Sequence, residues 1–240
     1  MWSARLNGDA TRAATGSADF TVKVWDAIAG TVLATLEHGH VVRSVDFSFD
    51  GARLATGGQD KKLRVFDMAR LDAPPAVIEC PERIRKVAWS RDDALVYTGS
   101  DDGAVRVYSV AAGGGALVAE AQLHAGGGVG DLELSADGAT LTVAAAREVL
   151  LLDAASLAVR VRHRLPYAVE AASLHPGAGK RFVAGGSDVH VHVHDADTGA
   201  ELACHKGHHG TVHCVRFAPD GETYVSGADD AIIRIWKLDV

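Results

Sequence analysis

The sequence predicts an all-β fold made of six similar units of about four strands each. Apolar and polar residues alternate with a period of two in short runs such as TVKVWD (21–26) and KLRVFD (62–67), which is typical of half-buried strands. Corners such as the Asp-Gly pair at 50–51 separate these runs, and glycine contributes 26 of the 240 residues against only 6 prolines. The whole pattern also recurs at a nearly constant interval, which indicates a repeat architecture.

The repeat is measured from one large residue near the end of each unit, which we call the anchor. Successive anchors are 41, 42, 44, 42 and 42 residues apart. A four-stranded sheet of about 42 residues cannot bury both faces alone, so we expect the units to stack around an axis as one β-propeller domain over residues 1–240. The anchors are Trp25, Phe66, Tyr108, Leu152, His194 and Trp236, and the units lie near 1–37, 38–79, 80–123, 124–163, 164–204 and 205–240.

The first and last units are predicted to be incomplete. The first has its innermost strand at 2–7 and an outer strand near 31–36, while the last has strands near 211–218, 222–227 and 231–237 and no outer strand. This gives about 23 strands. Uncovered sheet edges of this kind invite pairing with another chain.

Composition limits the classes of function. A net charge of −7 argues against a protein that holds nucleic acid by bulk charge, and 23% charged with 48% hydrophobic residues predicts a soluble globule. No stretch approaches the roughly 20 apolar residues of a membrane-spanning helix. Three cysteines spread over the chain and a start without an apolar signal region favour a reducing compartment, the cytosol or nucleus.

An aspartate stands six residues before the anchor in five of the six units, and only the fourth unit, with Ala146, departs. Gly-His pairs, such as Gly207-His208, precede some units, and Trp-Asp or a close equivalent ends them. These features resemble the WD-repeat family, which implies a β-propeller. The five aspartates are Asp19, Asp60, Asp102, Asp188 and Asp230.

His208, Ser226 and Asp230 have the residue types of a hydrolase triad. The family resemblance implies instead that these residues and Trp236 form a buried structural network, and no G-x-S-x-G elbow accompanies the serine. We therefore predict no catalytic residue. Partial networks are expected at His40, Thr56, Asp60 and Phe66, at Thr15, Asp19 and Trp25, at Thr98 and Asp102 beside Tyr108, and at Asp188.

Histidines form a second candidate site. His190, His192 and His194 alternate along one strand, so their side chains should project from one face about 6–7 Å apart, close enough for two of them to hold zinc. A second group offers six possible ligands within eleven residues, but His208 belongs to the network and the spacing matches no common zinc finger. The sequence therefore favours a structural role and predicts neither metal nor cofactor. The second group is Cys204, His205, His208, His209, His213 and Cys214.

Basic residues recur along the chain, and Arg43, Arg85 and Lys86 are the candidate residues of a binding surface. A solvated rim is the default interpretation of such charges, and a docking patch for an acidic protein or RNA is the alternative.

Longer strings are similar to one branch of the WD-repeat family, the serine/threonine kinase receptor-associated (unr-interacting) proteins. They include TGGQDKKLRVFD (56–67), FVAGGSD (182–188) and KGHHGTVHCVRFAPDGE (206–222). The resemblance implies a seven-bladed scaffold without catalytic residues, so this chain would be a member that lacks its first blade, through a truncated gene model.

The same resemblance implies partners and location. Members work with the survival-of-motor-neuron (SMN) complex in assembling spliceosomal ribonucleoproteins, and hence in mRNA splicing. The partners would be proteins of the Sm and Gemin type, with RNA reached only indirectly, in cytoplasm and nucleus. In animals, Smad proteins and receptor kinases of TGF-β signalling would be added.

Two other hypotheses remain open. One is a scaffold like the i subunit of translation initiation factor three, a related propeller. The other is an enzyme with its site in the central channel, for which the sequence offers no acid-base pair or nucleophile beyond the structural network.

Overall fold

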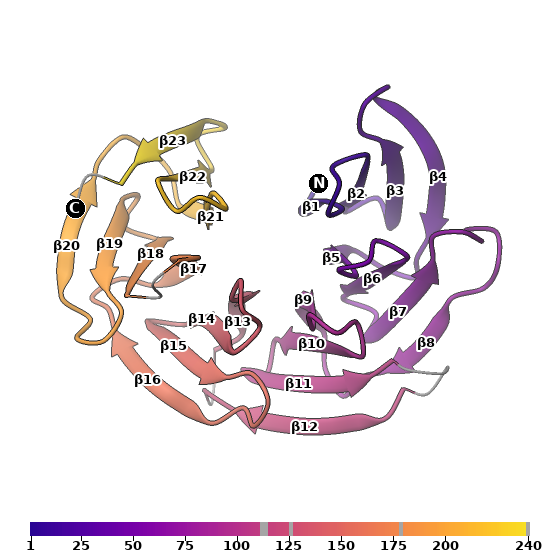
Figure 1. Ribbon diagram of the computed structural model, residues 1–240, viewed down its shortest axis with the longest axis horizontal. Helices are drawn as coiled ribbons and strands as arrows, with labels where there is room; N and C mark the ends of the chain where they lie inside the picture. The colour runs from indigo at the N-terminus through magenta and orange to yellow at the C-terminus, as the bar shows by residue number, and fades with distance from the viewer. Residues whose placement is uncertain (111–114, 125–126, 178–179, 239–240) are drawn as a thin grey trace. The chain divides into compact units, whose positions relative to one another are not determined.

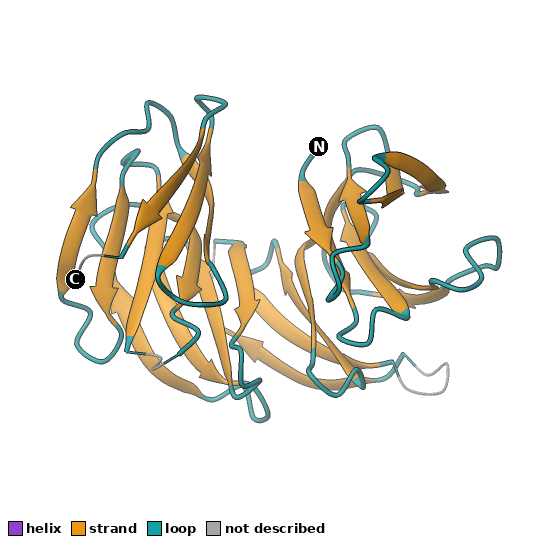
Figure 2. Cartoon of the chain, turned by 45° about the horizontal axis from the view of Figure 1, so that its top comes forward, coloured by secondary structure: helices purple, strands orange, loops and turns teal. Residues whose placement is uncertain are grey.

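The computed structural model describes residues 1–110, 115–124, 127–177 and 180–238 (Figure 1). These residues form 23 strands and no helix, joined by turns and loops (Figure 2). The strands make six antiparallel sheets, which we call blades 1 to 6 in chain order, so the predicted all-β class with six sheets is confirmed. The chain divides into two compact units, Met1–Gly128 (unit 1) and Val129–Val240 (unit 2). The single-domain expectation stays a prediction.

Unit 1 holds blades 1 to 3, each a four-stranded meander in which consecutive strands pair. Blade 1 has four strands, so the prediction that the first unit is incomplete was wrong. The blade 1 strands are β1 (Ser3–Leu6), β2 (Arg12–Gly16), β3 (Thr21–Asp26) and β4 (Thr31–Glu37). Blade 2 consists of β5 (Val42–Phe47), β6 (Arg53–Gly58), β7 (Lys62–Asp67) and β8 (Ala76–Glu79). Blade 3 consists of β9 (Ile84–Trp89), β10 (Leu95–Ser100), β11 (Ala104–Ser109) and β12 (Leu117–Gln122).

Unit 2 holds blades 4 to 6, and within its described residues blade 6 has three strands, as predicted. Blade 4 consists of β13 (Val129–Leu134), β14 (Thr140–Ala145), β15 (Glu148–Asp153) and β16 (Val159–Arg164). The blade 5 strands are β17 (Val169–Leu174), β18 (Arg181–Gly186), β19 (Val191–Asp195) and β20 (Glu201–His205). Blade 6 consists of β21 (Val212–Phe217), β22 (Thr223–Ala228) and β23 (Ile233–Lys237).

Apolar cores lie between successive blades within each unit, because each sheet places alternate side chains on opposite faces. Val22 and Val24 of β3 pack with Val42 of β5 and Leu54 of β6, and all four are fully buried. Burying an aliphatic side chain of this size contributes about 1.5–3 kcal/mol, as an upper estimate. Comparable clusters join blades 2 and 3, 4 and 5, and 5 and 6.

Hydrogen bonds also join the innermost strands of neighbouring blades. Ser44 Oγ in β5 accepts the Val87 amide of β9 at 3.1 Å, and Ser173 Oγ in β17 accepts the Phe217 amide of β21 at 3.1 Å. Each bond spans one repeat of the sequence, so a short polar side chain satisfies a backbone donor of the next blade. Equivalent bonds run from the amide of Val45 to Ser3, from that of Trp89 to Asp46 and from that of Ala172 to Asp131.

A buried ion pair spans two repeats within unit 2. Arg216 of β21 donates to both carboxylate oxygens of Asp131 in β13, at 2.5 and 2.8 Å, and Glu133 lies 3.4 Å from the guanidinium. Although burial opposes the charge, these two carboxylates hold the pKa of Arg216 well above its ordinary value. The pair ties blade 6 to blade 4.

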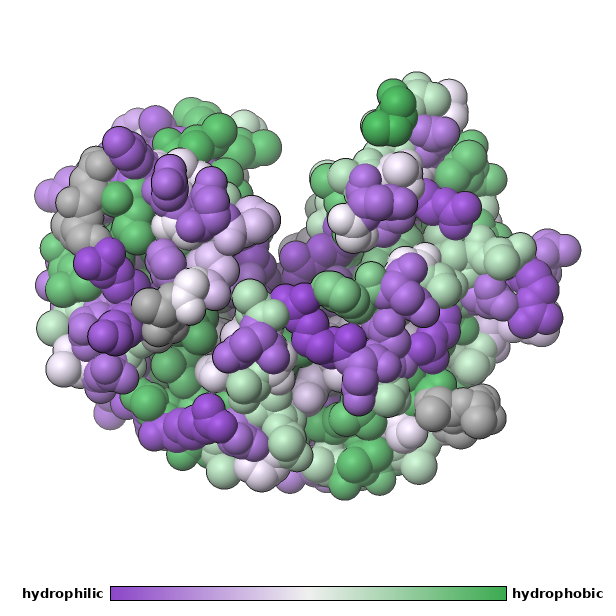
Figure 3. Space-filling view, viewed as in Figure 1, coloured by the Kyte–Doolittle hydropathy of each residue, from purple (hydrophilic) through white to green (hydrophobic). Residues whose placement is uncertain are grey.

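Blade 6 exposes apolar side chains along β22 and β23. Ile233 and Ile235 are 78% and 75% exposed, and Ile232 and Val225 are partly exposed. Apolar residues are visible over these strands in Figure 3. Among the described residues, no strand pairs with the outer side of β23.

No helix long and apolar enough to cross a membrane occurs in residues 1–110, 115–124, 127–177 and 180–238.

We expect Asp131→Ala to lower the free energy of unfolding by about 3 kcal/mol, because Arg216 loses both of its bonds to that carboxylate and keeps only Glu133, 3.4 Å away, as counter-charge. Chemical denaturation followed by tryptophan fluorescence measures this loss. The double variant Asp131→Leu/Arg216→Met is the control, and it should lose less than the single variant because no buried charge is left unpaired. Equal losses would contradict this account of the pair.

Candidate functional site

The predicted network of blade 6 is present. His208 Nδ1 lies 2.9 Å from Asp230 Oδ2, His208 Nε2 lies 2.7 Å from Ser226 Oγ, and Trp236 Nε1 donates to the same hydroxyl at 2.8 Å. The loop residue His208 is thereby tied to β22, to β23 and to the turn between them. Burial opposes ionisation of Asp230, but donors from the His209 amide, the His208 ring and the Ile232 amide lower its pKa to about 2.

The serine, histidine and aspartate have the connectivity of a hydrolase triad but not its accessibility. Ser226 is only 1% exposed, and its oxygen also accepts the indole N–H of Trp236. A nucleophile must reach the substrate carbon, and this hydroxyl is enclosed between protein groups. The arrangement serves to tie strands together, and each neutral bond contributes about 1 kcal/mol.

Blade 2 has a network of the same kind, but His40 is not in it, so that prediction was wrong. His38 Nε2 lies 2.8 Å from Thr56 Oγ1, and its ring lies against Phe66 with centroids 5.8 Å apart. The exposed His40 ring accepts the Val41 amide instead. Since His208 precedes Ser226 by 18 residues and His38 precedes Thr56 by 18, the spacing of the blade 6 network would have selected the right histidine.

In blade 1, Trp25 Nε1 donates to Thr15 Oγ1 at 2.9 Å, as predicted. Asp19 does not join these two residues. It is exposed and accepts hydrogen bonds from the amide and the hydroxyl of Thr21 at the corner between β2 and β3.

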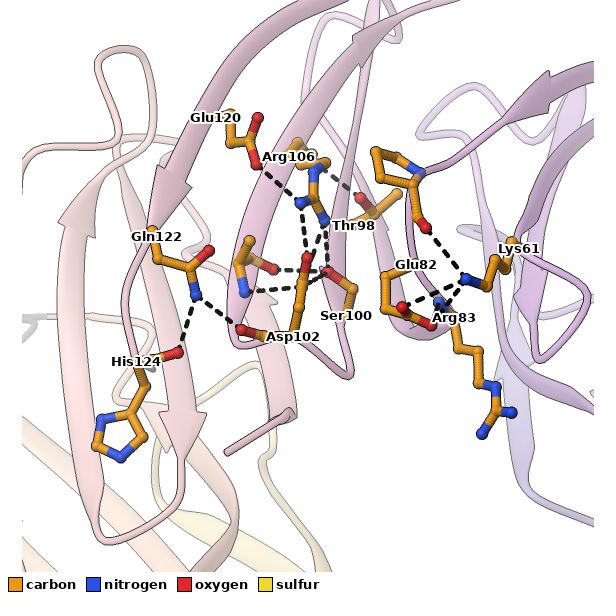
Figure 4. Close-up of polar contacts among 12 residues, drawn as sticks. Lys61, Glu82, Arg83, Thr98, Ser100, Asp102, Arg106, Glu120, Gln122 and His124 are labelled. Carbon is orange, nitrogen blue, oxygen red and sulfur yellow. Dashed lines mark hydrogen bonds and ion pairs between the residues drawn. The ribbon is translucent and has the colours of Figure 1, made fainter. Parts of the chain in front are cut away.

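Blade 3 differs from the predicted network of Thr98, Asp102 and Tyr108 (Figure 4). Asp102 accepts from Ser100 Oγ at 2.6 Å and pairs with Arg106 at 2.7 Å, and Arg106 also reaches Glu120 at 2.8 Å. Thr98 donates only to the Arg106 carbonyl, at 3.4 Å. Burial would raise the pKa of Asp102, but Arg106, Ser100 and the Ala104 amide lower it to about 2. Blade 3 has the phenol of Tyr108 where blades 1 and 6 have an indole donor. The buried Arg106 pairs with the aspartate of the turn, as His208 does in blade 6.

The five predicted aspartates occupy equivalent corners and share a local role. Each carboxylate accepts the amide two residues later, at 3.0–3.4 Å, as Asp60 does from Lys62. The intervening residue has a positive φ, such as 61° at Lys61, and the carboxylate offsets the strain of that conformation. The residue four positions after each aspartate is basic, and two examples are Arg64, 2.6 Å from Asp60, and Arg106.

Blade 4 lacks this corner because its turn is one residue shorter. Leu54 pairs with the anchor Phe66, twelve residues later, whereas Leu141 pairs with the anchor Leu152, eleven residues later. Ala146, with φ of 52°, is the first residue of this shorter turn, between the paired Ala145 and Glu148. Buried leucines hold this blade, as expected for a unit without the network.

Blade 5 places Asp188 beside a histidine rather than a hydroxyl. Asp188 Oδ2 lies 2.6 Å from His192 Nε2, and Glu201 Oε2 lies 2.8 Å from His192 Nδ1. The ring centroids of His190, His192 and His194 are 6.2 and 5.9 Å apart, as the strand spacing predicted. His192, His194 and Glu201 can each offer one ligand atom to a metal. In the second predicted group, His208 lies in the blade 6 network and His213 pairs with Asp229 at 2.8 Å.

Arg43 and Arg85 occupy the same kind of position in blades 2 and 3. Each is the extra residue of a β-bulge near the start of the innermost strand, where the pairing of β5 with β6 and of β9 with β10 shifts register. A bulge directs a side chain away from the regular alternation. The Arg43 guanidinium lies 4.3 Å from the centre of the Trp2 ring, Arg85 forms an ion pair with Asp101, and Lys86 follows it. All three basic side chains are half-buried, and their role as a binding surface stays a prediction.

Comparison with known proteins agrees with this geometry. The family model "WD domain, G-beta repeat" matches residues 1–26, 30–67, 74–109 and 199–237. A serine-threonine kinase receptor-associated protein of chicken is 40% identical over 241 residues, covering all of this chain and 67% of that protein. The protein of the same name from Dictyostelium discoideum is 41% identical over 237 residues, covering 99% of this chain and 80% of its own length.

The chain belongs to the WD-repeat family and, within it, to the serine-threonine kinase receptor-associated proteins. Blade 4, with its shortened turn, lies in the segment that the repeat model does not match. Eukaryotic translation initiation factor 3 subunit I of Drosophila virilis is more distant, with 28% identity over 265 residues.

We expect Ser226→Ala to lower the free energy of unfolding by about 1–3 kcal/mol, because both His208 and Trp236 lose their hydroxyl partner in a buried setting. Trp236→Phe removes one of these bonds and should cost less than the serine variant. Thermal unfolding measures both. An esterase activity that Ser226→Ala abolishes without loss of folding would contradict the structural role.

We expect stability to fall as the pH drops from about 4 to about 2. The pKa values of Asp102 and Asp230 are lowered from 3.8 to about 2 in the fold, so their stabilisation is complete above the unfolded value and is lost as the folded carboxylates protonate. The free energy of unfolding, measured by denaturation at several pH values in this range, should depend less steeply on pH in Asp230→Asn than in the wild type. Ser226→Ala is the control, since it should lower stability without changing the slope. An unchanged slope in Asp230→Asn would contradict the assignment.

Proposed function

We propose that this protein is a non-catalytic WD-repeat scaffold that helps to assemble spliceosomal ribonucleoproteins with the SMN complex. Its membership of the serine-threonine kinase receptor-associated family carries this proposal. The partners are proteins of the Sm and Gemin type, with RNA reached through them, and the protein works in the cytoplasm and nucleus.

The use of polar groups inside the blades supports a scaffold rather than an enzyme. The hydroxyl of Ser226, which resembles a nucleophile, is enclosed by His208 and Trp236. The corner aspartates accept hydrogen bonds from turn amides and contact basic side chains, as Asp60, Asp102 and Asp230 do. Groups committed to strands and turns are not available to a substrate. The function of the chain then depends on the surface that these blades present.

The basic positions of unit 1 offer a surface of suitable charge. Arg43 and Arg85 lie at matching bulges of β5 and β9, two strands that pack side by side, and Lys86 lies next to Arg85. Guanidinium groups at these bulges suit acidic segments of a protein partner, because they bind carboxylates with two hydrogen bonds. Arg85 would exchange its pairing with Asp101 for such a contact. We propose that these residues contact the assembly factors.

Affinity capture with the tagged protein tests the proposal. We expect recovery of Sm and Gemin proteins, and we expect Arg43→Glu/Arg85→Glu to reduce that recovery by at least about tenfold through charge repulsion. Arg160→Glu/Arg162→Glu on the outer strand β16 is the matched control and should retain the partners.

Other outcomes would contradict this function. Recovery of initiation-factor or ribosomal subunits instead would favour a scaffold like subunit I of translation initiation factor 3, the more distant relative. Recovery of receptor kinases or Smad proteins alone would favour the association that the relatives' name describes. Equal losses in both arginine variants would show that the bulge residues are not the contact.

A further inference from the structure

Three potential metal ligands of blade 5 lie on one side of two neighbouring strands. His192 and His194 are two residues apart in β19 and so project from the same face. Glu201, at the start of β20, pairs in register with His194. The two histidines are only 5% and 3% exposed, whereas the glutamate side chain is about half exposed, which gives solvent a path to the group.

The hydrogen bonds of His194 leave one ring nitrogen available. Its Nδ1 lies 3.1 Å from the Gly199 carbonyl oxygen, which only accepts, so Nδ1 carries the proton. Nε2 then carries the lone pair, and the Tyr167 hydroxyl donates only a long hydrogen bond of 3.5 Å to it, which a metal ion would replace. A neutral imidazole whose other nitrogen is fixed by a carbonyl is the usual arrangement of a metal ligand.

His192 lies between two carboxylates. Its Nε2 lies 2.6 Å from Asp188 and its Nδ1 lies 2.8 Å from Glu201. Once Nε2–H donates to Asp188, the lone pair of Nδ1 would face a carboxylate oxygen and repel it. A cation bound by both groups, with Glu201 turned to admit it, would remove this repulsion.

We propose that His192 Nδ1, His194 Nε2 and a Glu201 carboxylate oxygen form a binding site for a zinc-like divalent cation. The ligand atoms of these three residues lie within 4.8 Å of one another. Two atoms bound to one zinc ion at about 2.0–2.2 Å lie roughly 3.3–3.6 Å apart. The Glu201 oxygen, now 2.8 Å from His192 Nδ1, must therefore move away from it to admit the ion, which rotation of this exposed side chain allows. Asp188 then holds His192 from outside the metal shell, as carboxylates commonly do.

The donor set and the charge select the kind of metal. Two imidazoles and one carboxylate suit zinc and other first-row transition ions, whereas magnesium and calcium prefer oxygen ligands. A divalent ion also balances the charges of Asp188 and Glu201, while a single proton on His192 balances only one of them. Three protein ligands leave a fourth position open to water or to a side chain of a partner.

Calorimetric titration of the metal-stripped full chain with zinc chloride tests the site. Near neutral pH we expect one zinc per chain, and magnesium chloride should give no binding. Zinc at about a hundredfold excess over its Kd should also raise the midpoint of thermal unfolding by about 5 °C. Failure of the wild-type chain to bind zinc would overturn the proposal.

Variants assign the ligands. We expect Glu201→Gln, a conservative change of an exposed side chain, to weaken zinc binding by at least about 10–100-fold, and His192→Ala to do so as well. His213→Ala is the matched control, because His213 also pairs with a carboxylate, Asp229, but no third ligand joins that pair in the part of the chain that the structure describes. Should His192→Ala fail to fold, Glu201→Gln still decides. Wild-type affinity in Glu201→Gln, or a loss in His213→Ala, would contradict the site. The titration does not depend on partner capture, so either proposal can fail alone.

Discussion

The spacing between the innermost strands of neighbouring blades is the constraint on which each unit depends. A side-chain oxygen of one inner strand accepts a backbone amide of the next, as Ser44 does from Val87 and Ser173 does from Phe217. Such bonds fix the approach of the sheets at the point where the apolar cores begin. The amide and the side-chain oxygen of each bond lie one repeat apart in the sequence, which matches the near-constant spacing of the anchors. The buried pair of Asp131 and Arg216 adds a link across two repeats in unit 2.

Within a blade, the turn before the anchor strand is the second constraint. Its aspartate accepts the amide two residues later and holds a residue at positive φ, and the side chain that contacts the carboxylate differs from blade to blade. Arg64 and Arg106 do so in blades 2 and 3, His192 in blade 5 and His208 in blade 6. This variation explains why the repeats share a shape but not one hydrogen-bond network. In blade 5 the variant partner, His192, lies together with His194 and Glu201.

The sequence predicted what depends on local pattern. Alternation and repeat length were enough to predict 23 strands in six units, and the constant distance to the anchor was enough to locate the corner aspartates. The prediction of His40 was wrong because the Gly-His pair at 39–40 does not set the distance to Thr56, whereas His38 lies 18 residues before it, as His208 does before Ser226. The network predicted at Thr98 is absent because Cys80 stands 18 residues before it, where blades 2 and 6 have a histidine, and Tyr108 offers no indole donor. The pairing of Asp131 with Arg216 joins residues 85 apart, and no local pattern connects two such positions.

Amide hydrogen exchange measured residue by residue tests the role of the inner strands most directly. The account predicts that the amides of Val45, Val87, Trp89, Ala172 and Phe217, which bond to side chains of a neighbouring blade, exchange as slowly as amides inside the strand ladders. Fast exchange at these positions, with the ladder amides still protected, would mean that the blades fold as separate sheets and would contradict it.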